Sequence, residues 1–216
     1  MKSTLTNMVL VLFTITLLSS AMVGGVNLLT ERPIAEAREA AKQASLAEVL
    51  PTFDRTENWQ MESNGLQLTI NKAFSGDNVV GYAIESFSMS GYSGEVRLMV
   101  GFDVDGKIIN ISVLQQKETP GLGANMTKED NPLINSFRSK QAADIKMVVR
   151  KDGGDVDALT AATISSRAYT EAVALAYEAY KVASGKSTTM GDVATGASQQ
   201  KKGEDAKERR RRWKRV

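Results

Sequence analysis

The sequence predicts an α+β protein with one N-terminal transmembrane helix, followed by an antiparallel-sheet domain with flanking helices. Residues 8–26 carry no charged side chain. Between residues 66 and 114, short runs rich in β-branched and apolar residues follow one another, several of them separated by glycine turns. Residues 168–182 carry apolar side chains at spacings of three and four, which is helical spacing. Consecutive strands followed by helices are typical of the α+β class.

The composition excludes several kinds of functional site. The chain has 216 residues, enough for a sizeable core, but no Cys and no His. Disulfides, thiolate metal sites, iron–sulfur clusters of the usual kind and imidazole catalysis are therefore excluded. We predict no metal site, and any redox function would need an organic cofactor.

The net charge of +2 is unevenly distributed. Residues 201–216 hold nine Lys/Arg and three Asp/Glu, a net charge of +6, which leaves −4 for the rest of the chain. We expect residues 185–216 to form a disordered basic tail, since they are rich in Gly, Ser, Thr, Lys and Gln. A folded domain without a basic surplus does not favour nucleic-acid binding.

The first elements are predicted to be a membrane anchor and a stalk. At a rise of about 1.5 Å per residue, residues 8–26 nearly span a hydrocarbon core of about 30 Å, so we place the anchor at residues 1–29. A signal peptide cleaved after Ala21 is the alternative, and the apolar run that continues past this residue favours the anchor. Residues 30–52 are predicted to be an amphipathic stalk helix ended by Pro51.

Alternating or continuous apolar runs predict the strands of a domain at residues 53–184. A turn at residues 76–78 precedes the second run, and Asp105-Gly106 predicts a hairpin. The predicted strands are residues 66–74, with Leu66, Leu68 and Ile70 on one face; residues 79–84; residues 95–102, with Val96, Leu98 and Val100; residues 107–114, with Ile109, Ile111 and Val113; and a short strand at 145–149.

Three hydroxyl residues, Thr160, Thr163 and Ser165, lie where a glycine turn at residues 152–154 gives way to the predicted helix. A helix start has unpaired N–H groups and the positive end of the helix dipole, so it can bind a phosphate. The alternative is a Ser/Thr N-cap with no ligand.

Two further stretches carry closely spaced glycines. Residues 118–123 read Glu-Thr-Pro-Gly-Leu-Gly, a rigid turn that lets backbone approach a ligand, with Leu122 as an apolar contact for a ring. Residues 91–94 read Gly-Tyr-Ser-Gly, and Tyr92 can pack near the same ring.

Together these stretches resemble the RnfG/NqrC family of FMN-binding domains, from about residue 91 to 183. Residues 157–165, Asp-x-x-Thr-Ala-Ala-Thr-x-Ser, are similar to the flavinylation motif of that family. There a transferase joins FMN through its phosphate to the last Thr of a Ser/Thr-Gly-Ala-Thr tetrapeptide. The resemblance implies covalent FMN on Thr163, while Ala161 stands where the family usually has Gly. Gly-Tyr-Ser-Gly is closer to the RnfG branch.

The resemblance also implies roles for the surrounding residues. Backbone N–H groups of residues 164–166 would hold the phosphate, Asp157 and Thr160 would shape the attachment loop, and Lys151 would neutralise the phosphate. No catalytic acid or base is expected, because an electron relay needs none. The implied cofactor-binding residues are Thr163, Thr160, Ala162, Ile164, Ser165, Asp157, Lys151, Glu118, Thr119, Gly121, Leu122 and Tyr92.

The function implied by the resemblance is electron relay in a membrane ferredoxin:NAD⁺ oxidoreductase complex that couples electron transfer to Na⁺ or H⁺ translocation. The implied partners are the other membrane subunits, the flavin transferase and the membrane. The implied location is the cell inner membrane, with a single span and the FMN domain on the periplasmic side. Two alternatives remain: a membrane-tethered binding module in which Thr163 only caps a helix, or a flavinylated domain that serves another extracytoplasmic reductase.

Overall fold

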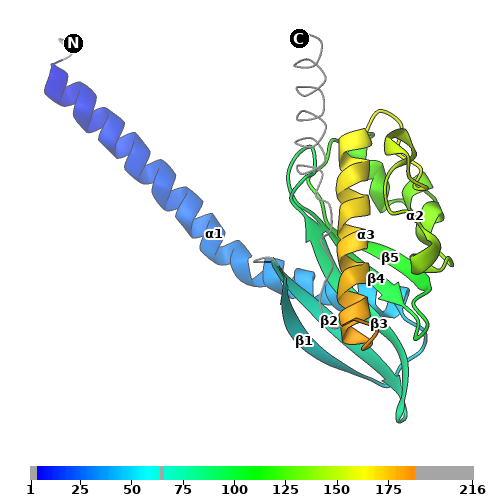
Figure 1. Ribbon diagram of the computed structural model, residues 1–216. Coiled ribbons are helices and arrows are strands. Elements are labelled where there is room, and N and C mark those ends of the chain that lie inside the picture. Colours follow the sequence, from blue (N-terminus) through cyan, green and yellow to red (C-terminus); the bar gives the residue numbers. More distant parts are fainter. Residues whose placement is uncertain (1–3, 64–65, 188–216) are drawn as a thin grey trace, which may run out of the picture. The chain divides into compact units, whose positions relative to one another are not determined.

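The computed structural model describes residues 4–63 and 66–187, which form two units divided after Gln43. The expected basic tail beyond residue 187 lies outside the described residues. Helix α1 spans Leu5–Val49 (Figure 1). Its residues up to Gln43 form the first unit, and its last residues belong to the second unit. This helix continues through Pro33 and joins the stretches expected to be anchor and stalk. It is long and apolar enough to cross a membrane.

The second unit is built on a five-stranded antiparallel sheet in the order β1-β2-β3-β4-β5. Each strand therefore pairs with its neighbour in sequence, as the hairpin turns predict. The strands are β1 Arg55–Ser63, β2 Leu66–Ser75, β3 Asn78–Ser88, β4 Val96–Phe102 and β5 Ile108–Gln115.

The edge strand β1 has no counterpart among the predicted strands. Its sequence, Arg-Thr-Glu-Asn-Trp-Gln-Met-Glu-Ser, is mostly polar, and most of its side chains are exposed. An edge strand pairs on one side only and buries little apolar surface, so it lacks the alternation that marks central strands.

The β4–β5 hairpin is closed by the predicted Asp105-Gly106 turn, with Gly106 at φ +94°. The Asp103 carboxylate accepts hydrogen bonds from three successive backbone N–H groups of this turn. A register shift beside Phe102 then changes the predicted alternation of β5. Ile108, rather than Ile109, is buried together with Ile111.

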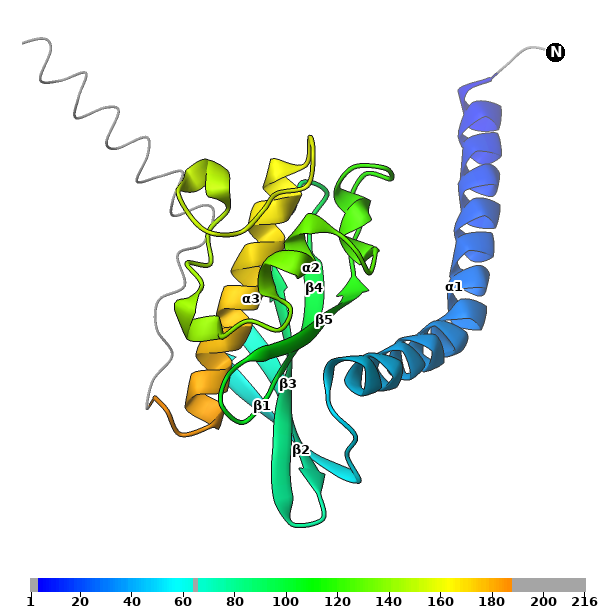
Figure 2. The ribbon, with the colours of Figure 1, turned by 90° about the vertical axis from the view of Figure 1, so that its right-hand side faces the viewer.

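Helix α3, Thr163–Ala183, covers one face of the sheet, and residues 44–50 at the end of α1 cover part of the other (Figure 2). The stripe predicted from Ala168 to Ala179 faces the larger core. On the opposite face, Leu46, Val49 and Leu50 pack on Ala73, Ala83 and Met99. The end of α1 is thus part of the sheet domain and forms a layer on the face of the sheet opposite α3.

The strand predicted at residues 145–149 is wrong. This segment makes one parallel bridge, between Val149 and Val156, and lies between two short 3₁₀ turns, η2 Ala142–Asp144 and η3 Arg150–Asp152. The Asp155 carboxylate accepts the Lys146 N–H at 2.7 Å, and the Lys146 and Val148 carbonyls accept the N–H groups of Asp155 and Val156, both at 3.1 Å. A few bonds to residues 155 and 156 thus replace the ladder of a full strand. A short helix α2, Pro132–Phe137, and the 3₁₀ turn η1, Gly123–Thr127, complete the chain between β5 and α3.

Candidate functional site

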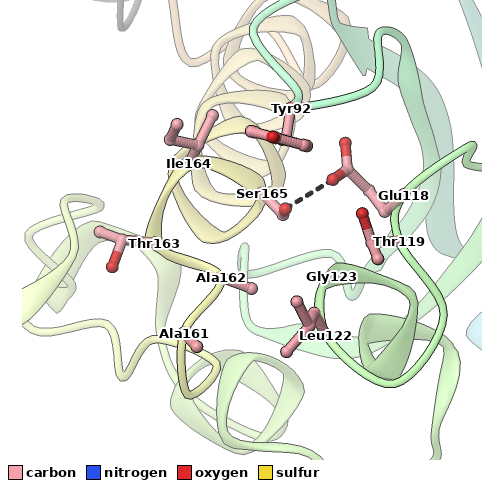
Figure 3. Close-up of a pocket in the computed structure, with 10 residues that line it drawn as sticks. All are labelled: Tyr92, Glu118, Thr119, Leu122, Gly123, Ala161, Ala162, Thr163, Ile164 and Ser165. Carbon is pink, nitrogen blue, oxygen red and sulfur yellow. Dashed lines mark hydrogen bonds between the residues drawn. The ribbon is translucent and has the colours of Figure 1, made fainter.

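A pocket of about 520 Å³ lies where three separate parts of the chain meet (Figure 3). They are the loop between β3 and β4, the segment that runs from β5 into η1, and the first turn of α3. The lining residues are Tyr92, Glu118, Thr119, Leu122, Gly123, Ala161, Ala162, Thr163, Ile164 and Ser165.

The start of α3 is open to a ligand. Ala162 precedes the helix and gives no side-chain cap. Among the described residues, no protein acceptor takes the N–H groups of Thr163, Ile164 and Ser165. The alternative of a Ser/Thr N-cap is therefore wrong for this helix, and its positive end faces the pocket with free donors.

The loop before the helix is held by the fully buried Ser166. Its hydroxyl accepts the Leu159 N–H and donates to the Ala162 carbonyl, both at 2.9 Å. A tight turn closes between Leu159 and Ala162, whose N–H donates to the Leu159 carbonyl at 3.1 Å. The third residue of this turn, Ala161, has φ +57°. That is the left-handed region, where Gly is favoured, and it is the position where Gly is usual in the motif.

The segment at residues 118–123 forms a second turn. The Leu122 N–H donates to the Thr119 carbonyl at 3.1 Å, and Gly121 has φ +78°. Pro120 followed by Gly in this geometry is the type II pattern. The turn presents Thr119 and Leu122 to the pocket, while Gly121 lies outside its lining.

Glu118 joins the three parts of the chain that form the pocket. Its carboxylate accepts the Ser93 N–H at 3.1 Å and the Ser165 hydroxyl at 2.7 Å. The first bond reaches the β3–β4 loop and the second reaches the first turn of α3. Figure 3 shows the Ser165 side chain directed toward Glu118 while Thr163 projects on another side of the turn.

An ion pair ties α3 to the preceding turn at residues 150–153. Arg167 donates two hydrogen bonds to Asp152, at 2.7 and 2.8 Å. These bonds hold the pKa of the Asp152 carboxyl below its ordinary value. Both side chains are partly exposed, so we expect only a modest contribution to stability.

Some of the residues implied by the resemblance do not line the pocket. Lys151 is exposed in η3, and Thr160 is exposed in the turn before α3. The Asp157 carboxylate pairs with Arg150 at 3.0 Å, and its N–H donates to Ser136. The lining does bring together Tyr92, Glu118, Thr119, Leu122, Ala162, Thr163, Ile164 and Ser165 from that set.

Several residues outside the predicted set of cofactor-binding residues also shape the site. Gly123 and Ala161 line it, and both stand inside stretches that the sequence had already singled out. Ser93 acts through its backbone N–H, which donates to Glu118, and Ser166 acts through its hydroxyl, which holds the turn before α3. The Ser166 N–H, expected to bind a phosphate with those of residues 164 and 165, is not available for this, because it donates to the Ala162 carbonyl at 3.0 Å. No sequence pattern indicates that the Ser93 N–H and the Ser166 hydroxyl have these partners, so only the structure identifies their roles.

Comparison with known proteins gives two family matches. The FMN-binding domain family matches residues 91–178, and the RnfG N-terminal region matches residues 1–49. Several curated relatives are named as a subunit of an ion-translocating oxidoreductase complex. The relative from Yersinia pestis is 34% identical over 160 residues, which cover 68% of this chain and 77% of the relative. The relative from Escherichia coli K12 is 32% identical over 167 residues, covering 72% and 81%.

A shorter match has higher identity. The relative from Shewanella amazonensis, which bears the same name, is 40% identical over 104 residues. These residues cover 47% of this chain and 48% of the relative, about half its length.

The pocket residues fit an FMN group. The volume of about 520 Å³ lies within the range of about 300–1,000 Å³ typical of small-molecule sites. Tyr92, Leu122 and Ile164 offer exposed apolar surface for a ring system. The free N–H groups at the start of α3 suit a phosphate, and the Thr163 residue belongs to the same turn.

Proposed function

The chain belongs to the RnfG family, whose members are subunits of ion-translocating oxidoreductase complexes, and from this premise we propose that it relays electrons through FMN held covalently on Thr163. The linkage would be a phosphoester between the FMN phosphate and the Thr163 hydroxyl. A cofactor attached in this way is reduced and reoxidised without leaving the protein.

The observation that carries this proposal is the uncapped start of α3 on the pocket wall, with Thr163 as its first residue. Most helix starts satisfy one or more of their N–H groups with a side chain. Here three successive N–H groups remain free among the described residues, beside a hydroxyl that can carry a phosphoester. An attached phosphate would accept hydrogen bonds from these N–H groups and interact favourably with the helix dipole.

The rest of the pocket would hold the ring. Tyr92 and Leu122 are exposed side chains that can contact its apolar surface, while Glu118 and Thr119 offer polar groups. When bound, FMN supplies the redox chemistry, accepting and passing on electrons. The protein's residues position the ring, exclude water from it and set its potential. Electron relay requires no catalytic acid or base.

We further propose that the complex is a ferredoxin:NAD⁺ oxidoreductase that translocates Na⁺ or H⁺, with the other membrane subunits and a flavin transferase as partners. Helix α1 would anchor the chain in the inner membrane, with the FMN domain on the periplasmic side. The apolar run continues past Ala21, so we expect the mature protein to keep its anchor. Intact mass measurement of membrane-derived protein tests this, and a chain that starts at Met22 would contradict it.

Mass spectrometry of the attachment peptide tests the covalent link. Trypsin should release residues 152–167, a peptide that holds both Thr160 and Thr163. We expect the FMN-phosphoryl mass on this peptide, with fragmentation placing it on Thr163. Thr163→Ala should abolish the modification, whereas Thr160→Ala should leave it on Thr163.

Matched variants and a gel separate the alternatives. Thr163→Ser keeps a hydroxyl at the same position, so any modification that it retains shows that the hydroxyl, rather than the shape of the side chain, is required. The FMN mass on Thr160 would refute the assignment to Thr163. Absence of flavin fluorescence on a denaturing gel would favour the binding-module alternative. Copurification with another reductase, but not with the subunits of an ion-translocating complex, would favour a flavinylated domain that serves that reductase.

A further inference from the structure

The pocket wall contains a buried carboxylate that pairs with no cation among the described residues. Glu118 is 5% exposed. One of its oxygens accepts a backbone N–H from Ser93 and the other accepts the Ser165 hydroxyl. Both partners are neutral donors, and in the described part of the chain no salt bridge involves Glu118.

Backbone encloses this carboxylate from two sides. A Cβ added at Gly91 would lie 2.7 Å from one Glu118 oxygen, and a Cβ added at Gly123 would lie 2.9 Å from the other. Real Cβ atoms do not approach oxygen so closely, so the two glycines allow the main chain to close around the carboxylate.

Another carboxylate that is equally buried does have a cationic partner. Glu85, on β3, is also 5% exposed, but the Arg97 guanidinium donates to it at 2.9 Å. Burying a carboxylate is costly unless opposite charge and hydrogen bonds compensate it. Among the residues that the structure describes, Glu118 has the hydrogen bonds without an opposite charge, and it lines the pocket. Uncompensated charge at such a position is typical of functional sites.

We propose that the negative charge of the Glu118 carboxylate lowers the reduction potential of the flavin in this pocket. The inference rests on the proposed function, because it requires FMN in the pocket. Reduction adds electrons and negative charge to the ring system. A fixed negative charge in the pocket wall disfavours that change, and the low dielectric of a buried site strengthens the effect.

The Ser165 hydroxyl moderates this effect. Its hydrogen bond places a partial positive charge against the Glu118 oxygen, which reduces the field that reaches the ring. Ser165 lines the pocket and is the third residue of α3, so the helix that bears Thr163 also holds the carboxylate in place. Removal of the charge and removal of the hydrogen bond should therefore shift the potential in opposite directions.

The test compares three variants of the full-length, flavin-loaded protein in a dithionite titration with a reference dye. Dithionite is oxidised, the flavin takes up its electrons, and protons come from the solvent. Glu118→Gln removes the charge while its amide can still accept from Ser93 and donate to the Ser165 oxygen, so we expect a more positive midpoint potential. Ser165→Ala keeps the charge without its donor, so we expect a more negative one. Glu85→Gln removes an equally buried charge outside the pocket and should leave the potential unchanged.

The stability of the flavin-free protein is the second measurement. In a Thr163→Ala background, which cannot take up covalent flavin, Glu118→Gln should unfold at the same or a higher urea concentration, because it removes a buried charge and keeps the contacts. A purely structural carboxylate would instead give a clear loss of stability and no shift of potential.

Each outcome decides the inference. An unchanged potential in flavin-loaded Glu118→Gln refutes it, and so do shifts of the same sign in Glu118→Gln and Ser165→Ala. If Glu118→Gln does not load flavin, Ser165→Ala decides: a more negative potential supports the inference and any other result overturns it. Wild-type protein that carries no flavin refutes the proposed function itself, and this inference with it.

Discussion

Replacing Ala161 by Gly should stabilise the protein, although most Ala→Gly changes destabilise. Ala161 is exposed, and it is the third residue of the turn that closes between Leu159 and Ala162. Its φ of +57° is in the left-handed region, where the Cβ of an L-residue approaches the following carbonyl oxygen. The flavinylation motif that this segment resembles usually has Gly at this position. The turn is kept because Ser166 holds both of its ends.

The expected magnitude follows from two opposing terms. The left-handed conformation costs a non-glycine residue about 1–2 kcal/mol, and Gly would remove this strain. Gly also makes the unfolded chain more flexible, which costs about 0.4–1 kcal/mol. The net gain in the free energy of unfolding should be about 0.5–1 kcal/mol. For a domain of this size, this corresponds to a rise in melting temperature of roughly 1–4 °C.

The assay is thermal unfolding of the full chain in detergent, with Ala162→Gly as the matched control. Ala162 is the next residue, has φ −131° and is 7% exposed. Because φ is negative, Gly there relieves no left-handed strain; it loses a buried methyl group and adds unfolded-state entropy, so we expect a loss of about 1–2 kcal/mol. The two variants thus make the same chemical change at adjacent positions with opposite expected signs.

A lower melting temperature in Ala161→Gly would refute this reasoning, and so would an equal loss in both variants. Either result would show that the strain at Ala161 is smaller than the entropic cost of Gly. Flavin content, measured on the same samples by absorbance, should not fall in Ala161→Gly, because the turn keeps its geometry and loses only its strain.

The remaining predictions concern packing and pH. Gly101→Ala would place a methyl group against the Val49 carbonyl, so the end of α1 must leave the sheet, and we expect a loss of about 3 kcal/mol or more in urea unfolding. Tyr169→Phe removes a buried hydroxyl that has no partner among the described residues, so the free energy of unfolding should change by less than about 1 kcal/mol, or rise. Because Arg167 lowers the Asp152 pKa, this pair stabilises the fold above the unfolded-state pKa of about 3.9 and loses its effect as the pH falls through the lower folded-state value. Asp152→Asn should therefore lower stability by less than about 1 kcal/mol at neutral pH and leave it unchanged near pH 2, as measured by thermal unfolding across that range.

The fold class could be predicted because the central strands and the final helix bury one face each. Alternation in residues 95–102 and the stripe from Ala168 to Ala179 are direct consequences of that burial. The same reasoning failed where burial does not set the pattern. Strand β1 lies at an edge and is polar, and a bulge beside Phe102 moves Ile108 into the core in place of Ile109. Residues 145–149 are mostly apolar like a strand, but short turns, one side-chain hydrogen bond and a few backbone bonds to residues 155 and 156 hold them in place of a strand ladder.

Local features of the sequence are enough to identify the stretches that line the pocket. The Pro-Gly turn at residues 119–122 and the hydroxyl residues around the start of α3 are of this kind, since turn geometry and helix starts depend on neighbouring residues. The membrane anchor is local in the same sense, because a charge-free run of sufficient length is enough to predict it.

What these stretches do together depends on tertiary packing. The fold brings Tyr92, Glu118 and Thr163 to one pocket from segments far apart in the chain, and it leaves Lys151 and Asp157 outside the lining. Sequence spacing cannot show this, because the distance between such residues depends on how the sheet and α3 pack. For the same reason, only the structure shows that the Glu118 side chain is buried beside two neutral hydrogen-bond partners, because those partners come from other segments of the chain.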